Sequence, residues 1–330
     1  MTYSLQDDIE DGVIDSTRVD ALNREMSAVT NRLVLRADER RDLDPEFNLV
    51  LQFLLKSFPT THESMIAILR HGNEAKLDGD KSKPAVTKFG PDAMLLARDQ
   101  LEKVFTVTLL LSDPIKWFKI YSQDDWRRQY EKHLYEKSER LGLDRFTDFH
   151  ENTAPEALER LRTGLAISDK QKEWIEHKYN DPGTKPPDHL LDHKVPEFPT
   201  AGKARTELIK HESAPMLERL HKEYKYLSGY AHSGAVKMFA QGVSDRRIGV
   251  AEEMRDRFFQ NEILGPSIVT SYCSSAAACT EVFKYLGGDV DLIAALTKQW
   301  EHLNKVSLLA KALWGLRGSK VLAFGFGPDR

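Results

Sequence analysis

The amino-acid sequence predicts an all-α protein, built as a bundle of many helices. Three observations lead to this fold class. Apolar residues recur at the three- and four-residue spacing of a helix along most of the chain. The chain contains no internal repeat and no alternation of strand-like and helix-like segments. Its 330 residues, of which 41% are hydrophobic and 30% charged, are enough to bury a core and exclude a disordered chain.

Charge is unevenly distributed along the chain. The formal net charge is −4, and the first twenty residues hold six acidic side chains against the single basic residue Arg18. We interpret residues 1–16 as a flexible acidic leader, and the rest of the chain is close to neutral. A polyanionic partner is therefore neither indicated nor excluded by charge.

The sequence predicts a cytoplasmic protein without a membrane segment. Its start lacks the basic and apolar regions of a secretory signal. The most apolar run, residues 104–111, is far shorter than the roughly 20 residues that cross a bilayer. Cys273 and Cys279 are the only cysteines, and their spacing does not put them on one helix face. We expect both thiols to be reduced.

In the first third of the chain, the pattern predicts helices over residues 17–38, 45–55, 60–69 and 91–112. Ser16 or Thr17 is a suitable cap for the first. Phe58-Pro59 is expected to separate the second from the third, which Thr60 or Thr61 would cap. The glycine-rich stretch 72–90 is predicted to be a loop.

The helix predicted to end at Ser112 is the most apolar one. Its β-branched run Val104–Leu111 resembles a strand, but it continues the helical spacing of Met94, Ala97 and Leu101. We therefore predict a helix, which Asp113-Pro114 stops, since a proline disfavours helical geometry in the residue before it.

The remainder of the chain is also predicted to be helical. Residues 115–141 carry many aromatic side chains at amphipathic spacing and are interpreted as a pair of surface helices that cover the core. Further helices are expected over residues 153–165, 168–179, 201–210, 215–231, 235–239, 252–259, 266–286 and 289–316. We assign one helical domain to residues 17–316 and an apolar, extended C-terminal arm to residues 317–330.

The helix predicted over residues 215–231 leads into the most polar stretch of the chain. Residues 224–234 include three tyrosines, two serines and one histidine. The core stripe of this helix comprises Leu217, Leu220, Tyr224, Leu227 and Ala231. Its flank carries His221, Lys225, Ser228 and His232. His232 is the candidate general acid or base, because its unperturbed pKa is about 6.5. Alternatively, it satisfies carbonyl groups at the end of the helix.

Arg98 and Glu102 form a second candidate. They are four residues apart among apolar neighbours on the helix predicted over residues 91–112. Burying one charge without the other costs several kcal/mol, so we expect the pair to have a structural or a binding role. One interpretation is a structural ion pair or a brace between helices. The other is that Arg98 reaches the histidine helix and binds a phosphate or carboxylate group.

These residues carry a resemblance to a known family. Arg98 and Glu102 on an apolar helix, followed by Tyr226, Ser228 and His232, resemble the motifs of an uncharacterised microbial all-helical family, a domain of unknown function. That family is distantly similar to HEPN domains, which are helical bundles that often act as metal-independent ribonucleases in toxin and phage-defence systems. The resemblance implies a HEPN-like core with N- and C-terminal helical extensions.

The resemblance covers roughly residues 50–285. In HEPN nucleases, an arginine a few residues before a histidine forms a composite site across a dimer. His232 matches the histidine, and the arginine position falls at 225–227, where Lys225 supplies a point charge without a guanidinium fork. The resemblance therefore implies His232, Lys225 and Arg98 as catalytic residues. The residues that bind or orient the substrate would be Glu102, Ser228, Tyr226 and Tyr230.

Three functions remain open. The first is an RNA-targeting toxin, phage-defence or stress factor that acts as a homodimer. The second is a non-catalytic dimerising or regulatory module of the same fold, in which the Tyr/Ser/His cluster is a structural network. The third is a small-molecule binder that uses a cleft near Arg98. No cofactor and no DNA-specific signal is expected. No metal site is predicted either, because His189 and His193 lack a third ligand.

Overall fold

The computed structural model describes residues 16–77, 85–139, 155–231 and 265–324, and most of these residues are helical. These residues contain no strand, and the predicted all-α class is confirmed. Among them, no helix is long and apolar enough to cross a membrane. The chain divides into two compact units, residues 1–112 with 200–330, and residues 113–199. The domain predicted over residues 17–316 thus comprises two such units.

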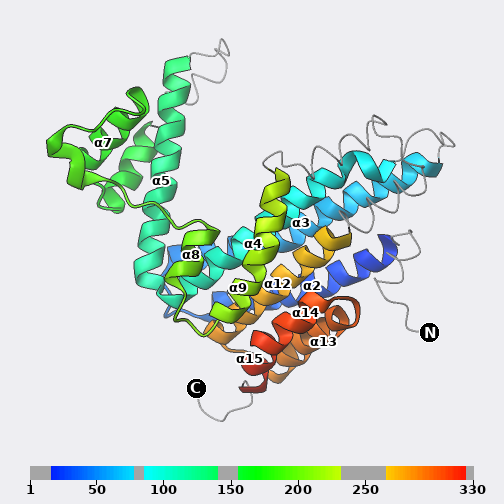
Figure 1. The fold of residues 1–330 in the computed structure, drawn as a ribbon. Helices are drawn as coiled ribbons and strands as arrows, with labels where there is room; N and C mark the ends of the chain where they lie inside the picture. The colour runs from blue at the N-terminus through cyan, green and yellow to red at the C-terminus, as the bar shows by residue number, and fades with distance from the viewer. Residues whose placement is uncertain (1–15, 78–84, 140–154, 232–264, 325–330) are drawn as a thin grey trace. The chain divides into compact units, whose positions relative to one another are not determined.

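The first unit is a helical bundle (Figure 1). Its elements are α2 (Ser16–Glu39), α3 (Pro45–Leu77), α4 (Ala85–Ser112), α8 (Ala201–Glu207), α9 (Ala214–Ala231), α12 (Gly265–Leu286), α13 (Val290–Val306), α14 (Leu308–Leu313), the π-helical turn η3 (Trp314–Gly318) and α15 (Ser319–Phe324). The predicted helices over residues 235–239 and 252–259, and the leader before Ser16, lie outside the described residues.

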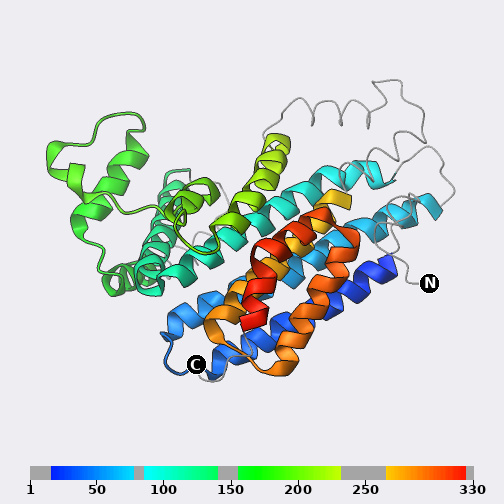
Figure 2. The same ribbon diagram turned by 60° about the horizontal axis from the view of Figure 1, so that its bottom comes forward.

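Helix α12 is the centre of this bundle (Figures 1 and 2). It packs against α2, α3, α4, α13, α14 and α15. Every residue from Thr270 to Phe283 is buried. The serines and alanines of this stretch allow close helix contact, and hydroxyls such as that of Ser274 donate to the carbonyl of the preceding turn. Gly287 ends the helix with a φ of 72°, which only glycine adopts without strain.

Helix α3 continues through Pro59, so the predicted break at Phe58-Pro59 is wrong. Thr61 does not cap a new helix, because its hydroxyl donates to the carbonyl of Ser57 at 2.9 Å. A proline inside a helix removes one backbone hydrogen bond and costs about 3 kcal/mol. Phe58 and Leu55, both fully buried, hold this part of α3 in the core and offset that cost.

The predicted loop over residues 72–90 is also largely helical. α3 runs to Leu77, and α4 begins at Ala85 rather than at Pro91. Only residues 78–84 of this stretch lie outside the described residues. The predictions that α4 includes the run 104–111 and ends at Ser112 are confirmed.

The C-terminal part departs from the prediction in two ways. The single helix expected over residues 289–316 is divided at Ser307, which has extended geometry and whose Oγ accepts a hydrogen bond from the backbone of Ala310 at 3.1 Å. The stretch expected as an extended arm is helical as far as Phe324. Val321 and Leu322 are buried, because this short helix packs on α12 and α13.

The second unit contains α5 (Pro114–Glu139), a helix over residues 155–164, α7 (Asp169–Asn180) and the 3-10 turn η1 (Asp188–His193). The helix pair predicted over residues 115–141 is one continuous helix as far as Glu139. Ser168 caps α7, since its hydroxyl accepts a hydrogen bond from the backbone of Gln171 and the side chain of Gln171 accepts one in return. The unit has its own core of Trp126, Tyr130, Leu158, Ile167, Ile175 and Val195.

Candidate functional site at the contact of α4 and α9

Helices α4 and α9 are packed against each other, and this contact brings Arg98 to the helix that precedes His232 in the sequence. Arg98 Nη2 donates to the hydroxyl of Tyr224 at 3.2 Å and to Oε1 of Glu102 at 3.1 Å. The Tyr224 hydroxyl donates to the same Glu102 oxygen at 2.9 Å. The three side chains therefore form a closed triangle of polar contacts that joins the two helices.

The register of the two helices follows from a second contact. The rings of Phe105 and His221 meet edge to face, with centroids 6.2 Å apart. Residue numbers on α4 therefore fall as those on α9 rise, so the helices are antiparallel. From Tyr224 to Ala231, where α9 ends, the helix rises by about 10 Å. The triangle thus lies about two turns before the end of α9.

The guanidinium of Arg98 is fixed by two partners, but not all of its N–H groups have one among the described residues. Burial opposes its charge, yet the contacts with Tyr224 and Glu102 outweigh this effect and raise the pKa of Arg98 above its usual value. Its Nε is buried and has no hydrogen-bond partner among the described residues. Arg98 also lies 5.4 Å from the ring centroid of Tyr224, within the range of a cation–π contact. A permanently charged guanidinium beside α9 suits an anionic ligand, although its Nε is too buried to take part.

Tyr224 is the site residue that the sequence did not identify. Its helical position assigns it to the apolar stripe, and its ring does stack on His221 with centroids 5.8 Å apart. Its hydroxyl, however, is the link between α4 and α9. A tyrosine on a core stripe is itself a signal for such a link, because a buried hydroxyl needs a partner.

His221 is buried rather than reachable, in contrast to the flank position that the sequence predicts. Its Nδ1 has no hydrogen-bond partner among the described residues. Burial, and then the nearby cations Arg205 and Lys225, lower the pKa of His221 below its usual value. The ring is therefore neutral at physiological pH and serves as a packing group.

Four of the other predicted site residues belong to the last two turns of α9: Lys225, Tyr226, Ser228 and Tyr230. Lys225 and Tyr226 are exposed. Ser228 is half-buried, and its Oγ has no hydrogen-bond partner in the described part of the chain. The backbone of Tyr230 belongs to α9. The side chain of Tyr230 and the whole of His232 lie outside the described residues.

The structure also bears on a metal site and on a small-molecule cleft near Arg98. In residues 16–77, 85–139, 155–231 and 265–324, no group of three or more His, Cys, Asp or Glu side chains is placed to hold a metal. His189 instead lies 3.3 Å from the carboxylate of Glu173. A pocket of about 300 Å³ between α8 and α9 is lined by Arg205 and Glu218 rather than by Arg98.

Comparison of the chain with protein-family models, with curated proteins and with solved structures gave no match.

Proposed function

We propose that this protein is a HEPN-like RNA-targeting factor of toxin, phage-defence or stress systems, with its RNA site along the contact of α4 and α9. The observation that carries the proposal is the Arg98–Tyr224 hydrogen bond of 3.2 Å, which fixes a guanidinium beside α9. Lys225, the next residue of α9, is exposed, and Ser228 has a buried hydroxyl without a hydrogen-bond partner among the described residues. Cations that hold a phosphate next to a histidine are the parts that metal-independent RNA cleavage requires.

The proposed reaction is attack of the ribose 2′-hydroxyl on the adjacent phosphorus. His232 accepts the proton of the 2′-hydroxyl, the O2′–P bond forms and the P–O5′ bond breaks. The products are a 2′,3′-cyclic phosphate and a strand with a 5′-hydroxyl, whose oxygen takes up a proton. Lys225 and Arg98 bind the phosphate oxygens, on which charge builds up during the step. We further propose that the protein is a homodimer in which both copies contribute residues to a composite site. Its proposed location is the cytoplasm.

The test is cleavage of single-stranded RNA in the presence of EDTA, with product ends identified by mass spectrometry. The wild type is expected to yield 2′,3′-cyclic phosphate ends. His232→Ala is expected to lower the rate by about 100-fold or more, as for loss of a general acid–base group. His189→Ala, an exposed histidine paired with Glu173, is the matched control and is expected to keep full activity. Equal rates for the wild type and His232→Ala would rule out the ribonuclease.

A second function, a non-catalytic dimerising or regulatory module, is favoured by one specific observation. The guanidinium of Arg98 is already paired within the chain, to Glu102 and Tyr224. This is the geometry of a structural brace. If the protein is such a module, we expect no RNA cleavage, and we expect Lys225→Ala to leave RNA binding unchanged. The RNA-targeting function predicts weaker binding for Lys225→Ala, with a smaller dependence on salt because one phosphate contact is lost.

A further inference from the structure

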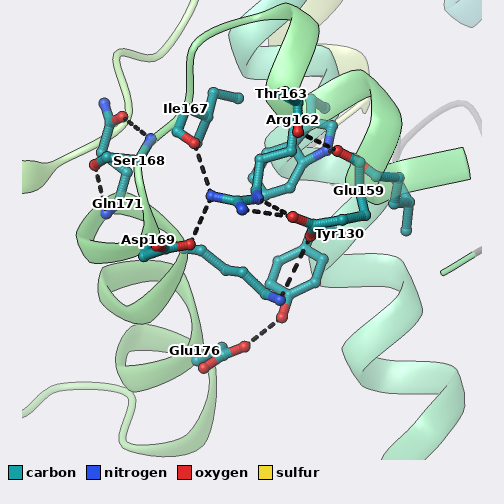
Figure 3. A network of polar contacts seen from close by, with 12 residues as sticks. Tyr130, Glu159, Arg162, Thr163, Ile167, Ser168, Asp169, Gln171 and Glu176 are labelled. Atoms are coloured by element: carbon teal, nitrogen blue, oxygen red, sulfur yellow. Dashed lines mark hydrogen bonds and ion pairs between the residues drawn. The ribbon is translucent and has the colours of Figure 1, made fainter. Parts of the chain in front are cut away.

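The second unit contains a small pocket that the proposed function does not use. It lies between α5, the helix over residues 155–164 and α7, and Figure 3 shows the polar network beside it. Its volume is about 210 Å³. The described residues that line it are Trp126, Tyr130, His133, Pro155, Leu158, Glu159, Lys172 and Glu176.

One side of the pocket is a rigid aromatic wall. The rings of Trp126 and Tyr130 are stacked, with centroids 5.0 Å apart and planes inclined by 10°. Trp126 Nε1 donates to the carbonyl of Leu158 at 2.8 Å, which locks the indole in place. Both rings are almost fully buried, so the wall is set by packing and does not need a ligand to form.

The lining of the pocket also includes two carboxylates with different partners, Glu159 and Glu176. Glu159 is neutralised, because its Oε1 accepts a hydrogen bond from Arg162 Nε at 2.8 Å. Glu176 accepts a hydrogen bond from the Tyr130 hydroxyl. Among the described residues, no basic side chain forms an ion pair with Glu176. The Glu176 carboxylate, which lines the aromatic pocket, thus has no ion-pair partner in the described part of the chain.

Tyr130 is the partner of Glu176, and it differs from Arg162, the partner of Glu159, in carrying no charge. Burial, and then the hydrogen bond and charge of Glu176, raise the pKa of the phenol well above its usual value. The phenol thus stays protonated and donates to one oxygen of Glu176 (Figure 3). It satisfies that oxygen but brings no positive charge, and a cation with N–H donors would supply both the charge and further hydrogen bonds.

Lys172 shows that the pocket attracts a cation. Its ammonium group lies 5.5 Å from the ring centroid of Tyr130 and 3.8 Å from Oε2 of Glu159. The second distance is longer than the 2.7–2.9 Å of a charge-assisted hydrogen bond. Lys172 is therefore held loosely, and its nearest carboxylate is Glu159, which Arg162 already pairs.

We propose that this pocket binds a small organic cation with N–H donors, either a primary alkylammonium or a guanidinium compound. Glu176 supplies the counter-charge, Tyr130 and Trp126 supply the wall, and Lys172 is an internal competitor. The volume equals that of roughly seven waters at about 30 Å³ each, so the ligand has only a few heavy atoms. The site is independent of the contact between α4 and α9.

The test is isothermal titration of the full-length chain with n-butylammonium chloride at constant ionic strength. Saturable binding is expected, and tetramethylammonium, which has no N–H donor, is expected to bind at least about tenfold more weakly. Glu176→Gln keeps the shape of the side chain and removes its charge. It is expected to weaken n-butylammonium binding by about tenfold or more, the loss of one charge-assisted hydrogen bond. Glu173→Gln, an exposed carboxylate of α7 outside the pocket, is the matched control and is expected to leave the affinity unchanged.

A second variant separates a cation site from an anion site. Lys172→Gln removes the internal competitor and is expected to tighten n-butylammonium binding. If Lys172 were instead the anchor for an anion, the same variant would abolish binding of inorganic phosphate. Circular dichroism verifies that each variant is folded. The proposal is overturned if the wild type shows no saturable n-butylammonium binding, if Glu176→Gln binds as well as the wild type, or if Lys172→Gln weakens binding.

Discussion

The guanidinium of Arg317 holds the carboxylate of Glu281 by two contacts inside the first unit. Nε lies 2.6 Å from Oε1 and Nη2 lies 3.0 Å from Oε2, and both side chains are about 4% exposed. Ser213 Oγ also donates to Glu281, at 2.9 Å. The π-helical turn η3 is thereby joined to the central helix α12 and to the segment before α9. Such turns often place a side chain where a regular helix would not.

Breaking this buried pair is expected to destabilise the protein strongly. Glu281→Gln leaves the charge of Arg317 with only the half-exposed Glu212, 3.0 Å from Nη1. We expect a loss of about 3–5 kcal/mol in the free energy of unfolding, measured by urea denaturation. The matched control is Glu25→Gln, which breaks the more exposed contacts with Lys298 and His302 and is expected to cost at most about 1 kcal/mol. Equal losses in the two variants would contradict the prediction.

Removal of the Tyr224 hydroxyl tests the contact between α4 and α9. Tyr224→Phe loses the hydrogen bonds of 2.9 Å and 3.2 Å to Glu102 and Arg98 but keeps the ring. We expect a loss of about 1–2 kcal/mol in the free energy of unfolding, measured by chemical denaturation. Lys222→Gln, at an exposed position of the same helix, is expected to change it by no more than about 0.5 kcal/mol. A Tyr224→Phe variant as stable as the wild type would show that the triangle does not hold the helices together.

His62 is expected to make stability depend on pH. The ring is fully buried, lies against Tyr272 with centroids 4.4 Å apart, and has no hydrogen-bond partner for either nitrogen among the described residues. Burial, with a smaller opposing contact to the backbone of Ser271 and a further lowering by Lys103, brings the pKa of His62 down to about 4.

Whether stability rises or falls with pH depends on the pKa of His62 in the folded and in the unfolded chain. Between pH 4 and 6.5 the unfolded chain binds the proton and the folded chain does not. The contribution to stability is therefore complete above about pH 6.5 and is lost as the pH falls towards 4, by roughly 3 kcal/mol in total. His62→Phe is expected to reduce the slope of unfolding free energy against pH in this window, measured by urea denaturation at several pH values. Identical slopes for the two proteins would contradict the buried, neutral histidine.

Two glycines of η3 give a matched pair of substitutions. A Cβ on Gly318 would lie 2.7 Å from Cε3 of Trp314 and 3.3 Å from atoms of Trp300, whereas a Cβ on Gly315 would meet nothing within 4 Å. Gly318→Ala is expected to cost about 1–3 kcal/mol through overpacking. Gly315→Ala is expected to stabilise by about 0.5–1 kcal/mol, because alanine loses less entropy in a helix. Thermal denaturation measures both, and a stable Gly318→Ala variant would show that the Trp300–Trp314 contact adjusts freely.

Helix ends with a local chemical signal were predicted from the sequence. Asp113-Pro114 marks the end of α4 and Gly287 follows α12, as predicted, and the helix expected from residue 168 begins at Asp169 with Ser168 as its cap. A proline or a capping side chain acts on its own turn of backbone. Its effect is therefore visible without knowledge of the rest of the fold.

Pro59 and the pair Gly90-Pro91 were interpreted as helix boundaries, and neither is one. The local cost of Pro59 is real, but α3 packs against α2, α4 and α12. The burial of Leu55 and Phe58 offsets the cost of one missing hydrogen bond there. The local cost of a proline is visible in the sequence, whereas the packing that offsets it exists only in the folded bundle.

By itself the sequence determined that the protein is helical, where most helices lie, and which residues share a face. It placed Arg98 and Glu102 together, because four residues make about one turn. Only the tertiary structure decided that Tyr224, 126 residues away from Arg98, completes that pair, and that Arg317 meets Glu281 in the core. The physical reason is that helical periodicity defines the faces of each helix, whereas the choice of which faces meet depends on the packing of the whole bundle.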